Sequence, residues 1–144
     1  MASEHDIASE VFQIKGRLLQ GTASATDREL LGAALASGNP LIRLIAASVV
    51  IAQGATGLAQ EALTVVTTAI RRNEIGGRFP QALFWEAMTS IPLDLIDQEA
   101  LLDVVQAHVD DPYTDRINVA FLLRRLSKIG STRALSLLPL YEPS

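Results

Sequence analysis

A pair of apolar helix patterns, joined by a short turn marked by Gly or Pro, recurs along this chain and limits the folds open to it. The second helix of three such pairs opens with an Ala-Leu step, at Ala62-Leu63, Ala100-Leu101 and Ala134-Leu135. These steps are 38 and 34 residues apart. A recurrence near this period is typical of stacked helical arrays, in which neighbouring units complete a core that no unit can bury alone.

The composition favours a helical core and a reducing environment. The 144 residues suffice for one domain, and 49% of them are hydrophobic while only 5% are aromatic. The core must therefore consist mainly of Ala, Leu, Ile and Val. The absence of cysteine excludes disulfides and thiolate metal sites. Because the acidic start has no signal-peptide pattern and the longest apolar stretch, 41–52, is shorter than a membrane span, we expect a soluble cytoplasmic protein.

The spacing of apolar residues by three and four predicts an all-α fold in one domain over residues 1–144. Four helical hairpins are expected, at roughly 4–37, 39–73, 79–109 and 111–140. The helix from about 40 to 53 is expected to be the most buried, because almost no polar residue interrupts its circumference. The residues expected to face inward include Leu41 on this helix and Ile117 and Ile129 near the end of the chain.

Capping signals predict where several helices begin. Thr26 and Glu29 have the spacing of a capping box. Asn39-Pro40 is typical of an N-cap followed by Pro at the first helical position, and Asp111-Pro112 repeats it. The remaining predicted starts are Thr56 or Gly57 for the fourth helix, Phe79-Pro80 for the fifth, Asp94 or Asp97 for the sixth and Ser131 for the last.

The stretch that runs from Asp110-Asp111-Pro112 through Arg116 and Ala120 to Arg133-Ala134-Leu135 resembles a HEAT-type repeat. In that family an Asp-Pro turn, an Arg four residues later, an Ala-rich first helix and an Arg-Ala-Leu turn recur from unit to unit. Asn39-Pro40 with Arg43 and Ala62-Leu63 match this pattern more loosely, and the third pair lacks the Arg. The resemblance implies a short right-handed α-α superhelix of about four hairpins, with an armadillo-like fold.

Residues suited to catalysis are scarce. His5 and His108 lie far apart, and the carboxylates near His108 have only a generic spacing for a metal site. Asp110 and Asp111 are better interpreted as helix caps before Pro112. The chain also lacks a Gly-x-Ser-x-Gly elbow and a Gly-rich phosphate loop with its flanking strand. We therefore expect no catalysis, no cofactor and no metal.

The order of charges distinguishes the last third of the chain. From Asp94 to Asp115 there are seven acidic residues and no Lys or Arg, and from Arg116 to Arg133 there are five Lys or Arg residues and no acidic one. On adjacent helices these charges either pair with one another or present a bipolar surface to a partner. Trp85 has two interpretations as well, as an exposed binding anchor or as a wedge between repeats. The candidate partner-binding residues are Arg71, Arg72, Arg78, Trp85, Asp103, Gln106, Arg124, Arg125, Lys128 and Arg133.

Proteins with similar repeats serve as scaffolds, adaptors and regulatory or inhibitory subunits, in bacteria among others, and the compact Ala-Leu-rich form favours a bacterial source. The resemblance therefore implies a non-catalytic module that binds a protein partner, as a monomer or a homodimer. One alternative is a subunit of a bilin (chromophore) lyase, because such enzymes contain similar Arg-Ala-Leu repeats. Another is nucleic-acid binding through the arginines, which the net charge of −4 and the pI of about 5.1 disfavour.

Overall fold

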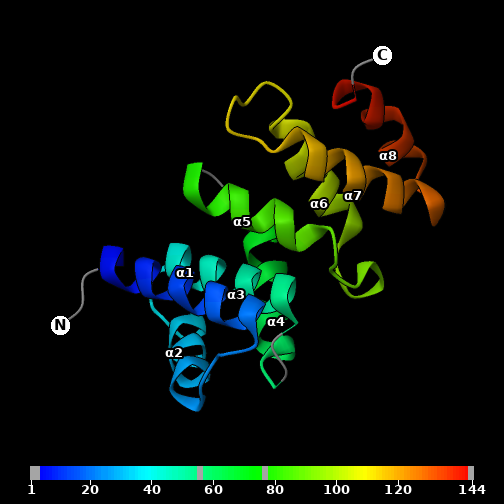
Figure 1. The fold of residues 1–144 in the computed structure, drawn as a ribbon. Helices are drawn as coiled ribbons and strands as arrows, with labels where there is room; N and C mark the ends of the chain where they lie inside the picture. Colours follow the sequence, from blue (N-terminus) through cyan, green and yellow to red (C-terminus); the bar gives the residue numbers. More distant parts are fainter. Residues whose placement is uncertain (1–3, 55–56, 76–77, 143–144) are drawn as a thin grey trace.

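The computed structural model describes residues 4–54, 57–75 and 78–142 and, of residues 4–6 and 78–80, the backbone alone. All regular structure in this part of the chain is helical, which confirms the predicted fold class (Figure 1). The α-helices are α1 (Glu4–Gln20), α2 (Ala25–Leu35), α3 (Pro40–Gln53), α4 (Ala59–Arg71), α5 (Arg78–Met88), α6 (Gln98–Ala107), α7 (Arg116–Lys128) and α8 (Thr132–Leu137). Two short 3₁₀ helices are η1 (Leu93–Leu95) and η2 (Leu138–Leu140). None of these described helices has both the length and the apolar content that crossing a membrane requires.

The helices pack against one another in two rows. The odd-numbered helices α1, α3, α5 and α7 each contact the next one in the row, and so do the even-numbered helices α2, α4, α6 and α8. Contacts between α1 and α2, α3 and α4, and α7 and α8 join the rows. The rows run diagonally across Figure 1, with α1 at one end of the molecule and α8 at the other.

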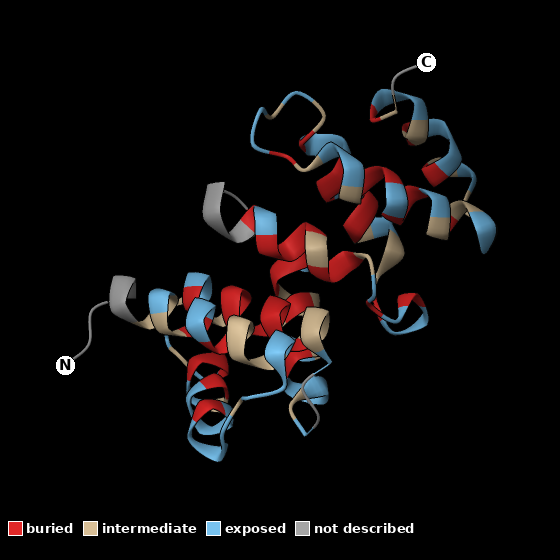
Figure 2. Ribbon diagram, in the orientation of Figure 1, coloured by how far each residue is buried: buried red, intermediate tan, exposed pale blue. Residues whose placement is uncertain are grey.

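Helix α3 forms the centre of the apolar core. It contacts α1, α2, α4 and α5, and every side chain from Leu44 to Val50 is buried (Figure 2). The expected burial of this helix is confirmed, but Leu41 is 43% exposed. Leu44 and Ile45, one turn further along the same side, are only 1% exposed. Leu41 is thus exposed although it lies on the same side of the helix as these buried residues.

Three predicted caps are confirmed. The Asn39 side chain accepts a hydrogen bond from the Leu41 amide at 2.8 Å, with Pro40 at the first helical position. Asp97 accepts from the Ala100 amide at 3.0 Å, and Ser131 from the Ala134 amide at 3.1 Å. Each bond satisfies an amide that the first turn of the helix leaves without a partner.

The predicted capping box of α2 is wrong by two residues. Ser24 Oγ accepts from the Asp27 amide at 3.2 Å, and Asp27 Oδ2 accepts from the Ser24 amide at 3.0 Å, whereas Thr26 is exposed. The carboxylate of Asp27 also binds Arg17 of α1, at 2.7 and 2.8 Å. This contact with α1 favours the capping box of Ser24 and Asp27 over the predicted one of Thr26 and Glu29. For α4, Thr56 lies outside the described residues, and the helix follows Leu58 without a side-chain cap.

The prediction that Asp111-Pro112 starts a helix is also wrong. Helix α7 begins at Arg116, where Asp115 Oδ1 accepts from the Asn118 amide at 3.1 Å. Asp111 instead accepts from the Tyr113 amide at 2.9 Å, within a turn. Ile117 is 82% exposed and Ile129 is 58% exposed, although both were expected to face inward. The inner face of α7 comprises Val119, Ala120, Leu122, Leu123 and Leu126.

Candidate interaction surface

The acidic and basic runs pair with each other where α8 meets α6. Arg133 donates to Glu99 Oε2 at 2.9 Å, to Asp103 Oδ1 at 2.6 Å and to Gln106 Oε1 at 2.9 Å. The hydrogen bond with Asp103, followed by that with Glu99, raises the pKa of Arg133. Three candidate partner-binding residues, Asp103, Gln106 and Arg133, are thus bound to one another. This corresponds to the intramolecular alternative for the charge pattern.

The end of α4 carries two further candidates, and both are exposed. Arg71 is the last residue of α4, and its Nε lies 3.9 Å from Asp97 Oδ2. It borders a shallow groove of about 290 Å³ whose wall includes Thr64, Thr67 and Leu95. Arg72 follows the helix and borders a separate groove of similar size. The basic ends of these side chains lie near the negative pole of α4, where positive charge is favourable.

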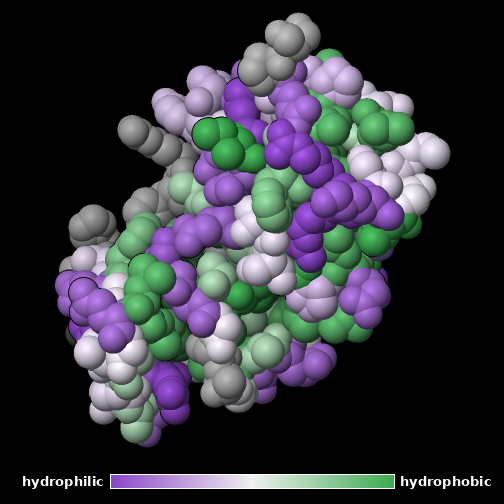
Figure 3. Space-filling view, turned by 45° about the vertical axis from the view of Figure 1, so that its right-hand side comes forward, coloured by the Kyte–Doolittle hydropathy of each residue, from purple (hydrophilic) through white to green (hydrophobic). Residues whose placement is uncertain are grey.

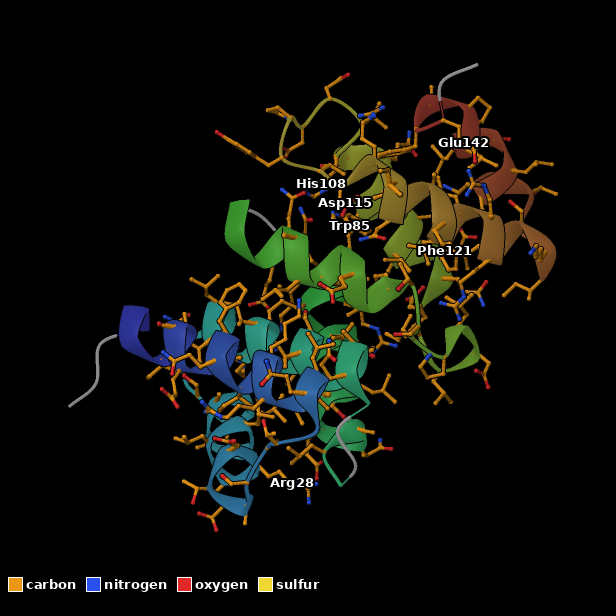
Figure 4. All side chains as sticks on the ribbon, in the orientation of Figure 1. Arg28, Trp85, His108, Asp115, Phe121 and Glu142 are labelled. Carbon is orange, nitrogen blue, oxygen red and sulfur yellow. The ribbon has the colours of Figure 1, made fainter. Side chains whose placement is uncertain are left out.

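Trp85 is fully buried and is not an exposed binding anchor. Its ring centroid lies 4.8 Å from that of Phe84 and 6.2 Å from that of His108, at the end of α6 (Figure 4). The indole Nε1 donates to Gln81 Oε1 at 3.3 Å. Trp85 therefore packs between helices, as its second interpretation proposes. The side chain of Arg78, another candidate, lies outside the described residues.

A buried polar cluster attaches the segment 109–115 to α5, and the sequence analysis did not anticipate it. Gln81 donates to Asp111 Oδ2 at 3.0 Å and accepts from Thr114 Oγ1 at 3.0 Å. The amide of Tyr113, followed by Gln81, lowers the pKa of Asp111. His108 is buried, with Nδ1 2.8 Å from the Val104 carbonyl oxygen. Throughout the described part of the chain no three His, Asp or Glu side chains lie close enough to hold a metal ion.

Two basic residues of α7 bind backbone carbonyl groups within the protein. Arg125 donates to the carbonyl oxygens of Met88 at 2.9 Å and of Ile91 at 2.8 Å, at the end of α5. Arg116 donates to the carbonyl oxygen of Val109 at 2.9 Å and to that of Leu140. Their guanidinium groups satisfy carbonyls that the ends of helices leave open. Arg125, a candidate for partner binding, is therefore a structural residue.

The segment after α8 folds back over α7. Tyr141 is buried, its hydroxyl donates to the Val105 carbonyl oxygen, and Arg116 lies over its ring at 4.8 Å from the centroid. Burial raises the pKa of Tyr141 to about 12. Glu142 forms an ion pair with Arg124. These contacts hold the backbone of 138–142 against α7 as one wall of a groove.

The most exposed apolar side chains of α7 lie on the side opposite its buried face. Ile117 is 82% exposed and Phe121 is 46% exposed, and the cationic residues Arg124 and Lys128 continue the same stripe. We call these four residues the α7 stripe. A groove of about 620 Å³ lies beside it, with walls that include Arg116, Ile117, Ala120, Arg124, Leu140 and Glu142. Figure 3, turned so that the right-hand side of Figure 1 comes forward, shows green hydrophobic patches among purple hydrophilic ones.

Arg124 and Lys128 were predicted as partner-binding residues from the sequence, whereas the apolar half of the stripe was not predicted. Ile117 was expected in the core as the first of a series with Ala120, Leu123, Leu126 and Ile129. Steps of three residues turn by about 60° around a helix, so the two ends of such a series leave the buried face. The pair Asp115 and Asn118 was a usable signal, because an Asp before the first turn of a helix is a preferred N-cap. A helix that begins at Arg116 places Ile117, Phe121, Arg124 and Lys128 on one side by their spacing of four, three and four.

Comparisons with protein-family models, with curated proteins and with solved structures found no match to the chain. A function must therefore be argued from the surface and its chemistry.

Proposed function

We propose that this chain is a non-catalytic protein-interaction module, a HEAT-like stack of helical hairpins that acts as a scaffold, adaptor or regulatory subunit. The two rows of contacts support the stacked arrangement, because each helix packs against its counterpart in the next hairpin. Two arginines at related positions support a repeat as well. Arg43 donates to the carbonyl oxygen of Ser37 at 2.7 Å, as Arg116 does to that of Val109 at 2.9 Å.

The observation that carries the proposal is the apolar half of the α7 stripe beside the groove. Large apolar side chains that gather on a surface next to a concave site are typical of protein-binding sites. Ile117, Phe121 and Leu140 are all more than 45% exposed. Three titratable side chains that the described fold buries, Asp27, His108 and Tyr141, are hydrogen-bonded within the protein. Of these three, Tyr141 alone borders the groove, and burial raises the pKa of its hydroxyl to about 12. The arrangement suits binding better than chemistry.

The proposal is tested by affinity capture from the lysate of the source organism with the tagged chain and two variants. The first variant, Ile117→Ser/Phe121→Ser, removes the apolar half of the stripe. The second, Leu19→Ser, removes an apolar side chain that is 67% exposed on α1, at the other end of the molecule. We expect the parent chain to capture one protein in a stoichiometric amount. Leu19→Ser is expected to capture the same amount, and the first variant at least about tenfold less. Equal capture by all three forms, or no captured protein, contradicts the proposal.

A further inference from the structure

The apolar and the cationic residues of the α7 stripe are separated along the helix. Ile117 and Phe121 occupy its first two turns, and Arg124 and Lys128 its last two. From Ile117 to Lys128 the helix rises by about 16 Å, at 1.5 Å per residue. A binding partner that follows this stripe therefore meets apolar side chains first and positive charges a turn or two later.

The charge along α7 is one-sided, although Glu142 borders the groove beside this helix. Between Arg116 and Arg133 the chain has five basic residues and no acidic one. Arg116 is held by the carbonyl oxygens of Val109 and Leu140 and forms part of the wall. Arg124 keeps 53% of its side chain exposed, even though it pairs with Glu142 at the groove. That ion pair demonstrates that a carboxylate can reach Arg124 from the groove side.

The backbone around the groove limits the shape of the occupant. The walls are α7 and the segment of η2, whose backbone groups bond within the chain, so no open strand edge is present here for an extended peptide. A helix instead presents side chains four residues apart, which is the spacing of Ile117 and Phe121. A second copy of this chain docked through its own α7 stripe would place Arg124 and Lys128 against the same cations if the two helices were parallel. If the helices were antiparallel, these cations would face Ile117 and Phe121 of the other copy, and neither arrangement is favourable.

We propose that the α7 stripe and its groove bind an acidic amphipathic helix of a partner protein. Two apolar side chains of that helix, one turn apart, pack against Ile117 and Phe121, and its carboxylates face Arg124 and Lys128. This inference rests on the proposed function, because it specifies which kind of protein the module binds. The apolar half of the contact supplies most of the buried surface. The charges select the partner and determine the orientation of its helix along α7.

The test uses two fluorescein-labelled helical peptides with the same apolar residues, at positions i, i+3, i+4 and i+7. One carries Glu and the other Lys at every remaining charged position. Binding is followed by fluorescence anisotropy at low and at physiological salt. We expect the acidic peptide to bind at least about tenfold more tightly than the basic one, and the preference to shrink as salt rises.

Three variants assign the binding to this surface. Lys128→Glu changes an exposed residue and is expected to weaken the binding of the acidic peptide several-fold. Arg124→Glu/Lys128→Glu is expected to reverse the preference, so that the basic peptide binds more tightly. Phe121→Ser is expected to weaken the binding of both peptides. Leu19→Ser is the matched control and is expected to bind like the parent chain. Circular dichroism and a thermal melt establish that each variant is folded before its binding is compared.

Equal affinity for the two peptides, no binding of either, or an unchanged preference in the charge-reversed variants overturns the inference. The lysate capture separates this result from a failure of the proposed function. If capture still depends on Ile117 and Phe121 while the acidic peptide has no advantage, the module binds a protein of other chemistry. If capture is also independent of these residues, both proposals are wrong.

Discussion

Helices α1, α2, α4 and α5 pack around the apolar helix α3, whereas α6 to α8 join them through buried apolar residues and an added set of polar contacts. Four helices cover α3, and seven consecutive residues of α3, from Leu44 to Val50, are buried. At the junction with α6 to α8, Gln81 binds Asp111 and Thr114, and Arg125 binds two carbonyl oxygens at the end of α5. The difference teaches that apolar packing holds both regions together and that, at the junction, hydrogen bonds from Gln81 and Arg125 add to it.

The largest effect is expected from a charge placed inside the first region. Ala47→Arg puts a guanidinium at a position that is fully buried in α3. An unpaired buried charge has lost its hydration, so we expect a loss of about 4 kcal/mol or more in the free energy of unfolding. Thermal and chemical denaturation measure it. A variant that melts within a degree or two of the parent chain would contradict the role assigned to α3.

A smaller effect is expected from loss of the polar junction. Gln81→Ala leaves the indole of Trp85, the hydroxyl of Thr114 and the carboxylate of Asp111 without this partner. We expect a loss of about 3 kcal/mol, because buried polar groups without partners are costly.

Hydrogen exchange locates that loss. Amides of α6, α7 and the segment 109–115 are expected to exchange faster in Gln81→Ala, while those of α3 keep more of their protection. Gln13→Ala, at an exposed position on α1, is the control and is expected to leave both regions unchanged. Uniform loss of protection over all helices would show that the two regions unfold as one unit. The proposed difference between them would then be wrong.

The smallest effect concerns a polar contact within the first region. Two hydrogen bonds from Arg17, followed by the Ser24 amide, lower the pKa of Asp27 from 3.8 to about 2. The folded state therefore holds this proton less tightly than the unfolded state does. The stabilising contribution is complete above about pH 4 and disappears as the pH falls towards 2. Because the Arg17 side chain is 34% exposed, solvent screens the pair and keeps the effect small.

Asp27→Asn removes this titration. We expect its denaturation midpoint to fall less steeply than that of the parent chain between pH 4 and pH 2, with the two curves parallel above that interval. Urea titrations at several pH values provide the measurement. If the slopes coincide at low pH, the pair of Arg17 and Asp27 does not link α1 to α2 as described.

Local signals were reliable where one residue and the next turn of helix decide the outcome. Asn39, Asp97 and Ser131 cap their helices as predicted, because a cap needs only its own side chain and amides two or three residues later. Ala100 follows its cap Asp97 by three residues, and Ala134 follows its cap Ser131 by three as well. The 34 residues between these two Ala-Leu steps are therefore the distance between two helix caps. Apolar periodicity likewise identified α3 as a buried helix.

Predictions were wrong where two equivalent local choices existed and a distant residue selected one. Arg17, from another helix, favours the capping box at Ser24 and Asp27 over Thr26 and Glu29. Gln81, thirty residues earlier in the chain, holds Asp111 in a turn and leaves Asp115 to cap α7. Without these partners in view, the sequence offers no means of choosing between the alternatives.

The sequence by itself determined that the chain is helical, where α3, α6 and α8 begin and which helix is buried, because these depend on residues within a turn or two of one another. Only the tertiary structure decided which charges are already paired and which apolar residues face outward. Arg125 and Arg133 are bound within the protein, while Ile117 and Phe121 are exposed. A side chain becomes part of a binding surface through what the rest of the fold leaves uncovered, and that depends on contacts between residues far apart in the sequence.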